Sequence, residues 1–587
     1  MNYNLNDSVY QQQAGARTWK VLGRMLGFIH TERRKLYTAL AAILLNALVL
    51  LSGPYLVGYT IDHDIVPKNV PGIWHMSLAL LCLYLLGFLT SYLQTQWMGS
   101  IGQQMLYALR NAVFGKILEL PLAFFQQNKS GDLISRINND TDRVNQFFSQ
   151  SLMQFIGNLI TMIGTGICLL VIQPVLGAVC LAPALLLLVF TRLASPWVKR
   201  KNKQNLQSLG GLSAEIQESL ENFKVVIVFK RRDYFRERFH KANQSNYQTS
   251  IWAGIANTLF VPVFGLCSSL AQLAVLAMGI YLIGTGHFSV GMLIGYLAYV
   301  YLFYSPLRQL AALWANFQLA MAAWDRIALL LGLQSNLLQL PATHTDSSSA
   351  LLEFRQVDFA YLPGKPVLSA ISFRLEPGKT YALVGPTGGG KSTLASLMAR
   401  LYDPDKGQVL LQGEDLRSLS GSGRSRRIGF ILQDPFVFSG TVLENIVFGS
   451  EDATALDADQ LLERLKERGL SELLGHFATD PKAALLQPAQ GLSLGQKQLI
   501  AFMRAVIREP DLLILDEASA NIDTLTEQLL EQALQRLPRK TTKVIIAHRL
   551  NTIESADEIY FINDGSMQAA GSMQHAMDML MHRRRSS

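Results

Sequence analysis

The chain has 587 residues, of which 49% are hydrophobic and only 16% carry a charged side chain. An ordinary soluble chain is about one quarter charged, so this composition disfavours a fully soluble protein and excludes a disordered, collagen-like or small disulfide-stapled one. The net charge of +8 does not indicate nucleic-acid binding, because charged residues are absent from four long stretches of the sequence.

These four stretches predict membrane spans. They contain no Asp, Glu, Lys or Arg and comprise residues 36–61, 69–109, 144–191 and 242–307. A helix crosses the apolar core of a bilayer with about 20 residues, so each of the first two stretches holds one span. The last two hold two spans each, divided at Gln173–Pro174 and at residues 284–286. The expected transmembrane helices are 36–60, 74–99, 152–172, 174–195, 251–283 and 289–313.

Basic residues predict the orientation of these spans. With six spans, both ends of the chain lie on one side. On that side, the segment before the first span and the two long loops together contain 22 Lys and Arg, against Lys68 alone on the other side. The positive-inside rule therefore predicts a multi-pass protein of the plasma (bacterial inner) membrane, with both termini in the cytosol.

Composition divides the chain into four parts. Residues 1–35 form a cytosolic N-terminus, where apolar residues at helical spacing fit an amphipathic helix on the membrane surface and fit an ordinary exposed helix nearly as well. Residues 36–332 form the transmembrane domain, and the polar residues 333–350 form a linker. Residues 351–587 form a second domain of a different kind.

The long cytosolic loops are expected to be helical extensions of spans two to five. Their tips, predicted at a turn over Gly131–Arg136 and at Phe229–Phe239, are candidate docking points for the second domain. In that domain, short apolar runs alternate with helical patterns, which indicates a buried and largely parallel sheet. These runs are Tyr381–Val384, Ile428–Leu432, Leu512–Leu515, Val544–Ala547 and Ile559–Ile562.

A glycine-rich loop follows the first of these strands and precedes a predicted helix. It matches the phosphate-loop pattern G-x-x-x-x-G-K-[ST] and reads Gly385, Pro386, Thr387, Gly388, Gly389, Gly390, Lys391, Ser392. Glycines allow successive backbone N–H groups to point at phosphate oxygens, and the helix N-terminus adds its positive dipole end. Lys391 is expected to reach the β- and γ-phosphates, and the Ser392 hydroxyl to bind Mg²⁺.

Two carboxylates follow the buried strand Leu512–Leu515. Asp516 suits Mg²⁺, directly or through water. Glu517 suits a general base, or an acceptor that orients the attacking water. A surface strand that ends in two solvated acids has the same pattern, but here it lies in one α/β domain with the phosphate loop.

At this point the sequence resembles the ABC transporter family over nearly its full length. The segment Leu492–Gln496, with the sequence LSLGQ, is close to the family signature LSGGQ and lies just before the Asp516–Glu517 strand. The resemblance implies a half-transporter of the exporter type: an all-α six-helix membrane domain followed by an α/β phosphate-loop ATPase domain with a helical subdomain.

The resemblance also implies the remaining site residues. Tyr361 is placed to stack on adenine, and Thr393 belongs to the phosphate-binding loop. Gln433, His548 and Glu517 are expected to be catalytic, with Gln433 joining Ser392 and Asp516 around Mg²⁺. Asp523 occupies the D-loop, and Ser493, Gly495 and Gln496 of the signature contact the ATP bound by a partner subunit.

Two departures from the family pattern favour one member of a heterodimer over a homodimer. Leu494 replaces the first glycine of the signature, at a point where the backbone approaches the γ-phosphate. The segment Ala483–Gly491 lacks the usual acidic residue, and Gln487 and Pro488 stand near its place.

The expected function is ATP-driven export of a hydrophobic or amphipathic molecule such as a lipid, drug or peptide, with ATP and Mg²⁺ as cofactors and a second half-transporter as partner. Aromatic residues in spans five and six favour such a cargo, although helix packing explains them equally well. An ATP-gated channel or regulatory receptor remains the alternative. A soluble cassette ATPase is excluded by the spans, and an importer is disfavoured by the fusion of both parts in one chain.

Overall fold

The structure is a computed structural model and describes residues 3, 5, 33–337, 339–341, 349–362, 364–450, 456–516, 524–546, 553–571 and 574–575. The chain divides into two compact units. The helical unit comprises Asp7–Ile117 and Gly131–Gly332, and the sheet unit comprises Met1–Asn6, Leu118–Ser130 and Leu333–Ser587. The expected amphipathic helix before residue 33 lies outside the described residues.

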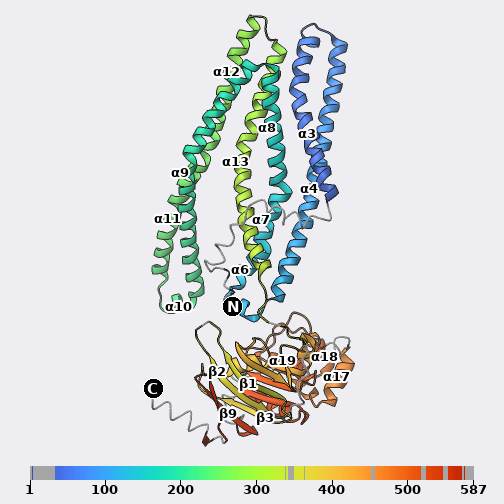
Figure 1. Ribbon diagram of the computed structural model, residues 1–587, viewed down its shortest axis with the longest axis vertical. Helices are drawn as coiled ribbons and strands as arrows, with labels where there is room; N and C mark the ends of the chain where they lie inside the picture. Colours follow the sequence, from blue (N-terminus) through green and yellow to red (C-terminus); the bar gives the residue numbers. More distant parts are fainter. Residues whose placement is uncertain are drawn as a thin grey trace. The chain divides into compact units, whose positions relative to one another are not determined.

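Six helices of the described chain are long and apolar enough to cross a membrane, and this confirms the fold class expected for the first half. They are built from α3 (Arg33–Thr60), α4 (Val70–Glu119), α8 (Leu152–Ile172), α9 (Pro174–Glu221), α11 with α12 (Arg232–Thr258, Phe260–Gly284) and α13 (Val290–Gly332). Shorter helices between them are α5 (Leu122–Gln127), α6 (Ser130–Ser135), α7 (Thr141–Gln146) and α10 (Phe223–Val228). Figure 1 shows the long helices running side by side.

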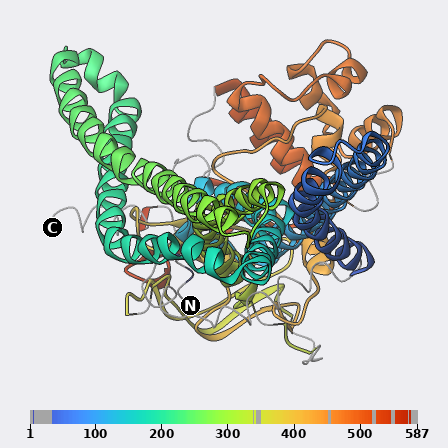
Figure 2. The same cartoon turned by 90° about the horizontal axis from the view of Figure 1, so that it is seen from above.

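Several of these helices are far longer than a bilayer requires. The α4 helix has 50 residues, which corresponds to about 75 Å, whereas the apolar core of a bilayer is about 30 Å thick. The α9 helix, with 48 residues, begins at Pro174 directly after extended Gln173, because proline fits the first turn of a helix and disfavours a helical residue before it. The α9 and α11 pair extends away from α8 and α13 in Figure 2.

Tyrosines of α13 hold the centre of the helical unit together. Tyr296 donates its hydroxyl to the Leu169 carbonyl of α8 at 2.8 Å, and Tyr304 donates to the Cys180 carbonyl of α9 at 2.8 Å. Tyr299 donates to a carbonyl of α3. All three side chains are buried, so they are packing residues, and they do not support the cargo preference inferred from the aromatics of this span.

The helices α3 and α13 approach each other closely through glycines. A Cβ atom on Gly295 would lie 2.5 Å from the Pro54 carbonyl oxygen, and one on Gly58 would lie 2.8 Å from that of Gly291. Next to this contact, the Asp62 carboxylate accepts the N–H groups of Gly291 at 2.8 Å and Met292 at 3.1 Å. It thereby satisfies two of the backbone donors that the start of α13 leaves unpaired.

A buried ion pair joins the start of the third span to the end of α13. Arg326 donates to both carboxylate oxygens of Asp140, whose side chain is only 5% exposed. Arg136, also buried, donates to the Arg326 carbonyl at 2.9 Å. The turn predicted over Gly131–Arg136 is therefore wrong: this segment is helical in α6, and Arg136 is turned inward to a partner that is distant in the sequence.

The sheet unit contains a six-stranded sheet in the order β10-β9-β3-β8-β7-β6. Its strands are β3 (Thr380–Val384), β6 (Ile428–Ile431), β7 (Leu512–Asp516), β8 (Thr542–Ile546), β9 (Glu558–Asn563) and β10 (Ser566–Ala569). All neighbours are parallel except the β9–β10 pair. The five apolar runs of the sequence thus form the five parallel strands, as predicted.

A second, antiparallel sheet was not predicted. It has the order β2-β1-β4-β5 and consists of β1 (Leu352–Phe359), β2 (Leu368–Leu375), β4 (Lys406–Leu411) and β5 (Glu414–Asp415). Buried side chains from both sheets and from α14 (Lys391–Met398) form one apolar cluster, in which Leu394 and Leu397 lie beside strand residues such as Leu383. This cluster fixes the first helix after the glycine-rich loop.

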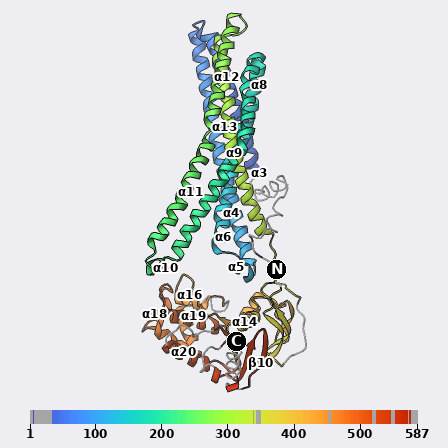
Figure 3. The same ribbon diagram turned by 90° about the vertical axis from the view of Figure 1, so that its left-hand side faces the viewer.

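The remaining helices of the sheet unit form a second cluster at one side of the six-stranded sheet (Figure 3). They are α15 (Gly421–Arg427), α16 (Val442–Val447), α17 (Ala458–Glu467), α18 (Pro481–Leu486), α19 (Leu494–Val506) and α20 (Thr524–Gln535). Buried residues of α16 to α20 and of the short helix Ser471–His476, among them Leu461, Leu474 and Leu499, form one apolar cluster, to which α15 contributes no buried residue. This is the helical subdomain expected beside the α/β core.

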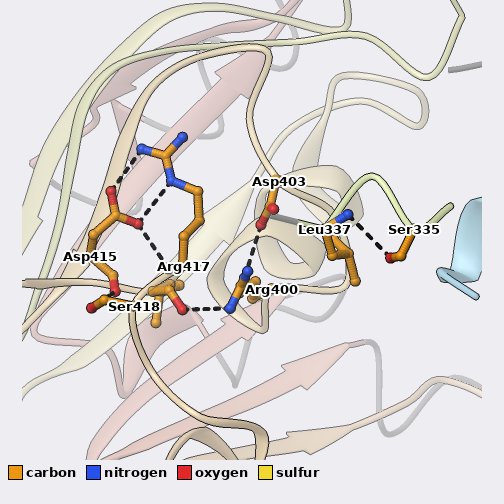
Figure 4. A network of polar contacts seen from close by, with 8 residues as sticks. Ser335, Leu337, Arg400, Asp403, Asp415, Arg417 and Ser418 are labelled. Atoms are coloured by element: carbon orange, nitrogen blue, oxygen red, sulfur yellow. Dashed lines mark hydrogen bonds and ion pairs between the residues drawn. The ribbon is translucent and has the colours of Figure 1, made fainter. Parts of the chain in front are cut away.

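The described part of the linker contains no helix or strand and is attached to the sheet unit. Leu340 donates its N–H to the Arg417 carbonyl at 3.0 Å, and Leu337 donates to the Ser335 hydroxyl at 3.3 Å. Figure 4 shows Ser335 and Leu337 together with the ion pair of Arg417 and Asp415, whose closest atoms are 2.7 Å apart.

Candidate nucleotide-binding site

The carboxyl ends of the parallel strands bring the predicted site residues to one edge of the sheet. In the strand register, Leu383 of β3 pairs with Ile546 of β8, and Ile546 also pairs with Asp516 of β7. The glycine-rich loop follows β3, and Gln433 lies two residues beyond β6, the neighbour of β7. Ligands of open parallel sheets bind at this edge.

Close backbone approaches explain the glycines of the loop. Gly385, Gly388 and Gly390 have φ values of +150°, +84° and +112°, which L-residues rarely adopt. A Cβ atom on Gly389 would lie 2.8 Å from the Ile562 carbonyl oxygen, and one on Gly390 would lie 2.8 Å from a methyl group of Leu368. The loop is thus pressed against β9 and β2, with no room for side chains on that face.

Lys391 is held inside the loop. Only 6% of this residue is exposed, and its ammonium group donates to the carbonyls of Gly385 at 2.9 Å and Pro386 at 3.0 Å. Because a buried ammonium needs partners, these carbonyls fix the cation at the centre of the loop. It stands at the first residue of α14, where the helix dipole also favours an anion.

Ser392 and Asp516 meet although 124 positions separate them in the sequence. The Ser392 hydroxyl donates to the Asp516 carboxylate at 3.3 Å. Hydroxyl and carboxylate oxygens are the donors that Mg²⁺ prefers, so this pair fits the ion. Among the described residues, no group of three or more His, Cys, Asp and Glu is placed to hold a metal by itself.

The aromatic Tyr361 is tied to the start of α14. Its hydroxyl donates to the Thr393 hydroxyl at 3.1 Å, and its ring meets Tyr402 edge-on, with 5.2 Å between the ring centres. The residue is still 40% exposed. A positioned, exposed aromatic face beside a phosphate loop can stack on a nucleobase.

Of the other predicted catalytic and D-loop residues, the structure describes only Gln433. Gln433 is exposed at the same sheet edge. Glu517, Asp523 and His548 lie outside the described residues: Glu517 directly follows β7, Asp523 directly precedes α20, and His548 is two positions beyond β8. Their roles in hydrolysis remain predictions.

The signature segment begins helix α19. The Ser493 hydroxyl accepts the Gln496 N–H at 3.2 Å, and the Gln496 side chain accepts the Ser493 N–H at 2.9 Å, which is a capping box. Gln496 also donates to the His476 carbonyl at 2.8 Å. Leu494 is 41% exposed, so its side chain lies on the open surface of the first helical turn.

Backbone hydrogen bonds pair the segment before the signature with the segment after Gln433. The sequence analysis did not predict this pairing. Val442 donates its N–H to the Gln487 carbonyl at 3.0 Å, and the Ala489 N–H donates to the Gly440 carbonyl at 2.8 Å. Gln487, one of the departures from the family pattern, takes part through its backbone carbonyl. This hydrogen bond therefore does not depend on which side chain stands at position 487. Two backbone hydrogen bonds therefore attach the segment before the signature to the segment after Gln433.

A further connection, between the segment after Gln433 and helix α19, is made by Asn445 and Arg504, two residues that the sequence analysis missed. Arg504 on α19 donates to the carbonyls of Asn445 at 2.8 Å and Phe436 at 3.0 Å. Asn445 in turn donates to the Phe438 carbonyl at 3.0 Å. The available signal was the apolar run after Gln433, in the sequence DPFVF. Backbone groups of such a run need hydrogen-bond partners wherever they are buried.

The first cytosolic segment belongs to the sheet unit. Ala123 of α5 packs against the apolar cluster of this unit, and the Tyr402 hydroxyl donates to the Gln126 side chain at 2.5 Å. Burial raises the pKa of Tyr402 to about 12, so this hydroxyl keeps its proton at neutral pH. The predicted docking of the first loop thus occurs through α5, before Gly131.

Comparison with known proteins identifies the class of this molecule. The family model described as "ABC transporter transmembrane region" matches residues 36–307, and the model described as "ABC transporter" matches residues 368–520. The first match covers the long helices and the second covers the phosphate loop, the signature and Asp516. The chain therefore belongs to the ABC transporter family and is an ATP-binding, ATP-hydrolysing membrane transporter.

Relatives match the chain over most of its length. An uncharacterized ABC transporter ATP-binding protein of Bacillus subtilis, YfiC, is 32% identical, with 96% of this chain and 93% of the relative covered. A fatty acid ABC transporter ATP-binding/permease protein of Mycobacterium bovis is 33% identical, with coverages of 89% and 81%. An ATP-dependent lipid A-core flippase of Thiobacillus denitrificans is 29% identical, with coverages of 94% and 95%.

Proposed function

We propose that this chain is one half of a dimeric exporter that uses ATP to move a lipid-like, hydrophobic or amphipathic molecule out of the cytosolic leaflet or the cytosol. The observation that carries the proposal is the joining of a six-span helical unit to a phosphate-loop site within one chain. Both parts are needed for ATP-driven transport.

Within this proposal the chain's own residues bind and orient the nucleotide. Tyr361 stacks on the base, and Lys391 with the loop N–H groups binds the phosphates. Ser392, Asp516 and Gln433 would hold Mg²⁺, which neutralises charge on the phosphates. Glu517 and His548 orient the attacking water and contact the γ-phosphate.

A dimer is supported by surfaces that one chain leaves open. The start of α19 is exposed at Ser493 and Leu494, and its N–H groups suit the phosphates of ATP on a second subunit. The aromatic side chains of Phe436, Phe438 and Phe448 are between 40% and 63% exposed. Phe436 lines a cleft of about 100 Å³ between β6 and α19, which a second half-transporter would cover.

The proposed location is the bacterial inner membrane with both termini in the cytosol, from the strong asymmetry of Lys and Arg between the two sides. The partner is a second half-transporter, and the departure at Leu494 favours a different chain over a second copy. Co-purification of the tagged chain from its native membrane, followed by mass determination of the complex, distinguishes the two.

The proposed cargo class follows relatives whose names specify fatty acid transport or lipid A-core flipping. It also agrees with the absence of charged residues from 242–307 in the last two spans. Three tyrosines of α13 are occupied in packing, so Tyr301, which is 62% exposed, is the better candidate of that span for a cargo contact.

The test is transport by the purified complex in proteoliposomes. Fatty acid, fluorescent phospholipid and a cationic dye are offered separately, and phosphate release is measured with each. Movement of one cargo that requires ATP and is lost in Lys391→Ala supports the proposal. ATP-dependent single-channel conductance in a planar bilayer, without uphill movement of any cargo, would instead identify the gated channel, which the named relatives do not favour.

A further inference from the structure

Tyr3 and Leu5, near the N-terminus, are buried in the sheet unit, although most of this unit is formed by residues after Leu333. They are only 1% and 5% exposed. The Tyr3 ring meets Phe124 of α5 edge-on, with 6.4 Å between the ring centres. Burial of this kind needs a specific partner surface, which α5 and the residue after it provide.

Asn128 pairs with the backbone on both sides of position 4. Its side-chain oxygen accepts the Leu5 N–H at 3.1 Å, and its side-chain nitrogen donates to the Tyr3 carbonyl at 2.9 Å. The same nitrogen donates to the Phe124 carbonyl at 2.8 Å and so satisfies the end of α5. The Tyr3 N–H donates to the Gln127 side chain at 2.6 Å. The side-chain amide of Asn128 thus forms one accepting and one donating bond with the backbone of Leu5 and Tyr3, as the backbone of a neighbouring β-strand would.

The Tyr3 hydroxyl reaches the linker. It accepts the Asn336 N–H at 2.8 Å, and it lies 3.0 Å from the Gln334 carbonyl oxygen and 3.1 Å from the Asn336 side-chain oxygen, its two acceptors. The linker is itself attached to the strands through Leu340 and Arg417. Tyr3 therefore bridges two segments, α5 and the linker, that are about 200 positions apart in the sequence.

We propose that Tyr3 and Leu5 form a clasp that fixes α5 to the linker and thereby makes the first cytosolic helix move with the ATPase domain. A six-residue helix is not stable alone, so α5 depends on such tertiary contacts for its position. The clasp goes beyond the proposed export function, and its existence is testable without any cargo.

The first experiment tests proximity in the full-length chain in native membranes. The photoreactive tyrosine analogue p-azidophenylalanine replaces Tyr3, and the matched control carries it at Tyr37, which is 68% exposed. Cross-links to peptides that contain 122–128 or 334–336, absent from the Tyr37 control, are expected. Cross-links elsewhere, or yields no higher than the control, would overturn the clasp.

The second experiment measures amide hydrogen exchange of residues 122–128 in the complex in nanodiscs. Tyr3→Ala and Asn128→Ala should each raise exchange about fivefold or more, the factor that corresponds to roughly 1 kcal/mol of a buried hydrogen bond. The control is Asn139→Ala, which removes an exposed side chain of the next helical segment and should leave this exchange unchanged. Unchanged exchange in both clasp variants would overturn the proposal irrespective of the transport result.

The positioning role is read from the amount of fluorescent phospholipid moved per phosphate released in proteoliposomes. Tyr3→Ala and Asn128→Ala should lower this ratio while ATP hydrolysis continues, and the double variant should be no worse than either single one. If exchange rises but the ratio stays at the parental value, the clasp holds α5 without coupling it, and that half of the proposal is wrong.

Discussion

The two units of this chain differ in how many large apolar side chains they leave exposed. In the sheet unit, two large apolar clusters, rich in leucine and isoleucine, form the interior. In the helical unit, large apolar residues such as Phe88 and Leu193 are more than 70% exposed, whereas Thr141, Thr165 and Asp140 are buried. Lipid is as apolar as leucine, so membrane helices gain no hydrophobic free energy from packing leucines inward.

This difference shows which contacts specify each unit. In the sheet unit, specificity comes from apolar packing around a polar edge that carries the ATP site. In the helical unit, it comes from a few polar and small residues: the Asp140–Arg326 pair, the tyrosine hydroxyls of α13 and the glycine contact with α3. Substitutions at these two kinds of position should therefore have different consequences.

The largest expected effect belongs to the polar edge of the sheet unit. Glu517→Gln should lower ATP turnover by about 10²-fold or more, the usual contribution of a general base, and should leave bound nucleotide trapped. Phosphate release and retention of labelled nucleotide are measured. Glu531→Gln, on the exposed face of α20, is the control. Turnover near the parental rate in the first variant would contradict the catalytic role of Glu517.

Asp140→Ala tests the ion pair of Asp140 and Arg326 in the helical unit. It removes the carboxylate that accepts both hydrogen bonds of the Arg326 guanidinium, at a cost of about 2–3 kcal/mol, below the range for fully buried pairs because the Arg326 side chain is 41% exposed. The midpoint of thermal unfolding should fall by about 3–5 °C. Asp142→Ala is the matched control, since Asp142 pairs with Arg110 at the surface at 2.9 Å. If both substitutions lowered the unfolding midpoint equally, the burial of Asp140 would not make its ion pair contribute more to stability than the surface pair.

Gly295→Ala tests the close contact of α3 with α13. The added Cβ would lie 2.5 Å from a backbone oxygen, and such overpacking costs about 1–3 kcal/mol. Gly265→Ala on α12 has no atom within 4 Å of the new carbon and should be neutral or slightly stabilising. Thermal unfolding in detergent compares the two, and a stabilised Gly295→Ala variant would rule out the close contact.

The smallest effect is expected at the exposed signature residue. Leu494→Gly should change ATP turnover by less than about tenfold, since one backbone contact contributes about 0.5–1.5 kcal/mol. The change should appear in a complex whose own loop is silenced by Lys391→Ala, because we propose that the signature serves the partner's site. Leu486→Gly, at another exposed leucine, is the control. A change seen only when Lys391 is intact would argue against an active site shared between subunits.

Much of the fold could be predicted from local patterns. Stretches without charge predicted six spans, and five apolar runs predicted the five parallel strands, because a segment buried on all sides must be apolar throughout. The antiparallel sheet was missed, since strands such as β2 have only a few buried residues separated by exposed ones and carry no such continuous signal.

The parts of the candidate site that could be predicted are those in which one short segment contains all the residues needed for one function. The phosphate loop from Gly385 to Ser392 is such a segment, because its glycines and lysine are needed together. The pairing of Val442 with Gln487, the Asn445–Arg504 connection and the clasp at Asn128 were not predictable. Each joins residues that are ordinary by themselves and whose significance depends on a partner far along the chain.

The sequence by itself determined the class of protein, the spans and the order of the ATP-site motifs, because hydropathy and phosphate binding depend on residues next to one another. Only the tertiary structure decided that Arg136 is turned inward to α13, that the tyrosines of α13 are occupied in packing, and that Tyr3 meets α5 and the linker. These contacts arise between distant segments, and a hydrogen bond has no trace in the sequence of either partner alone.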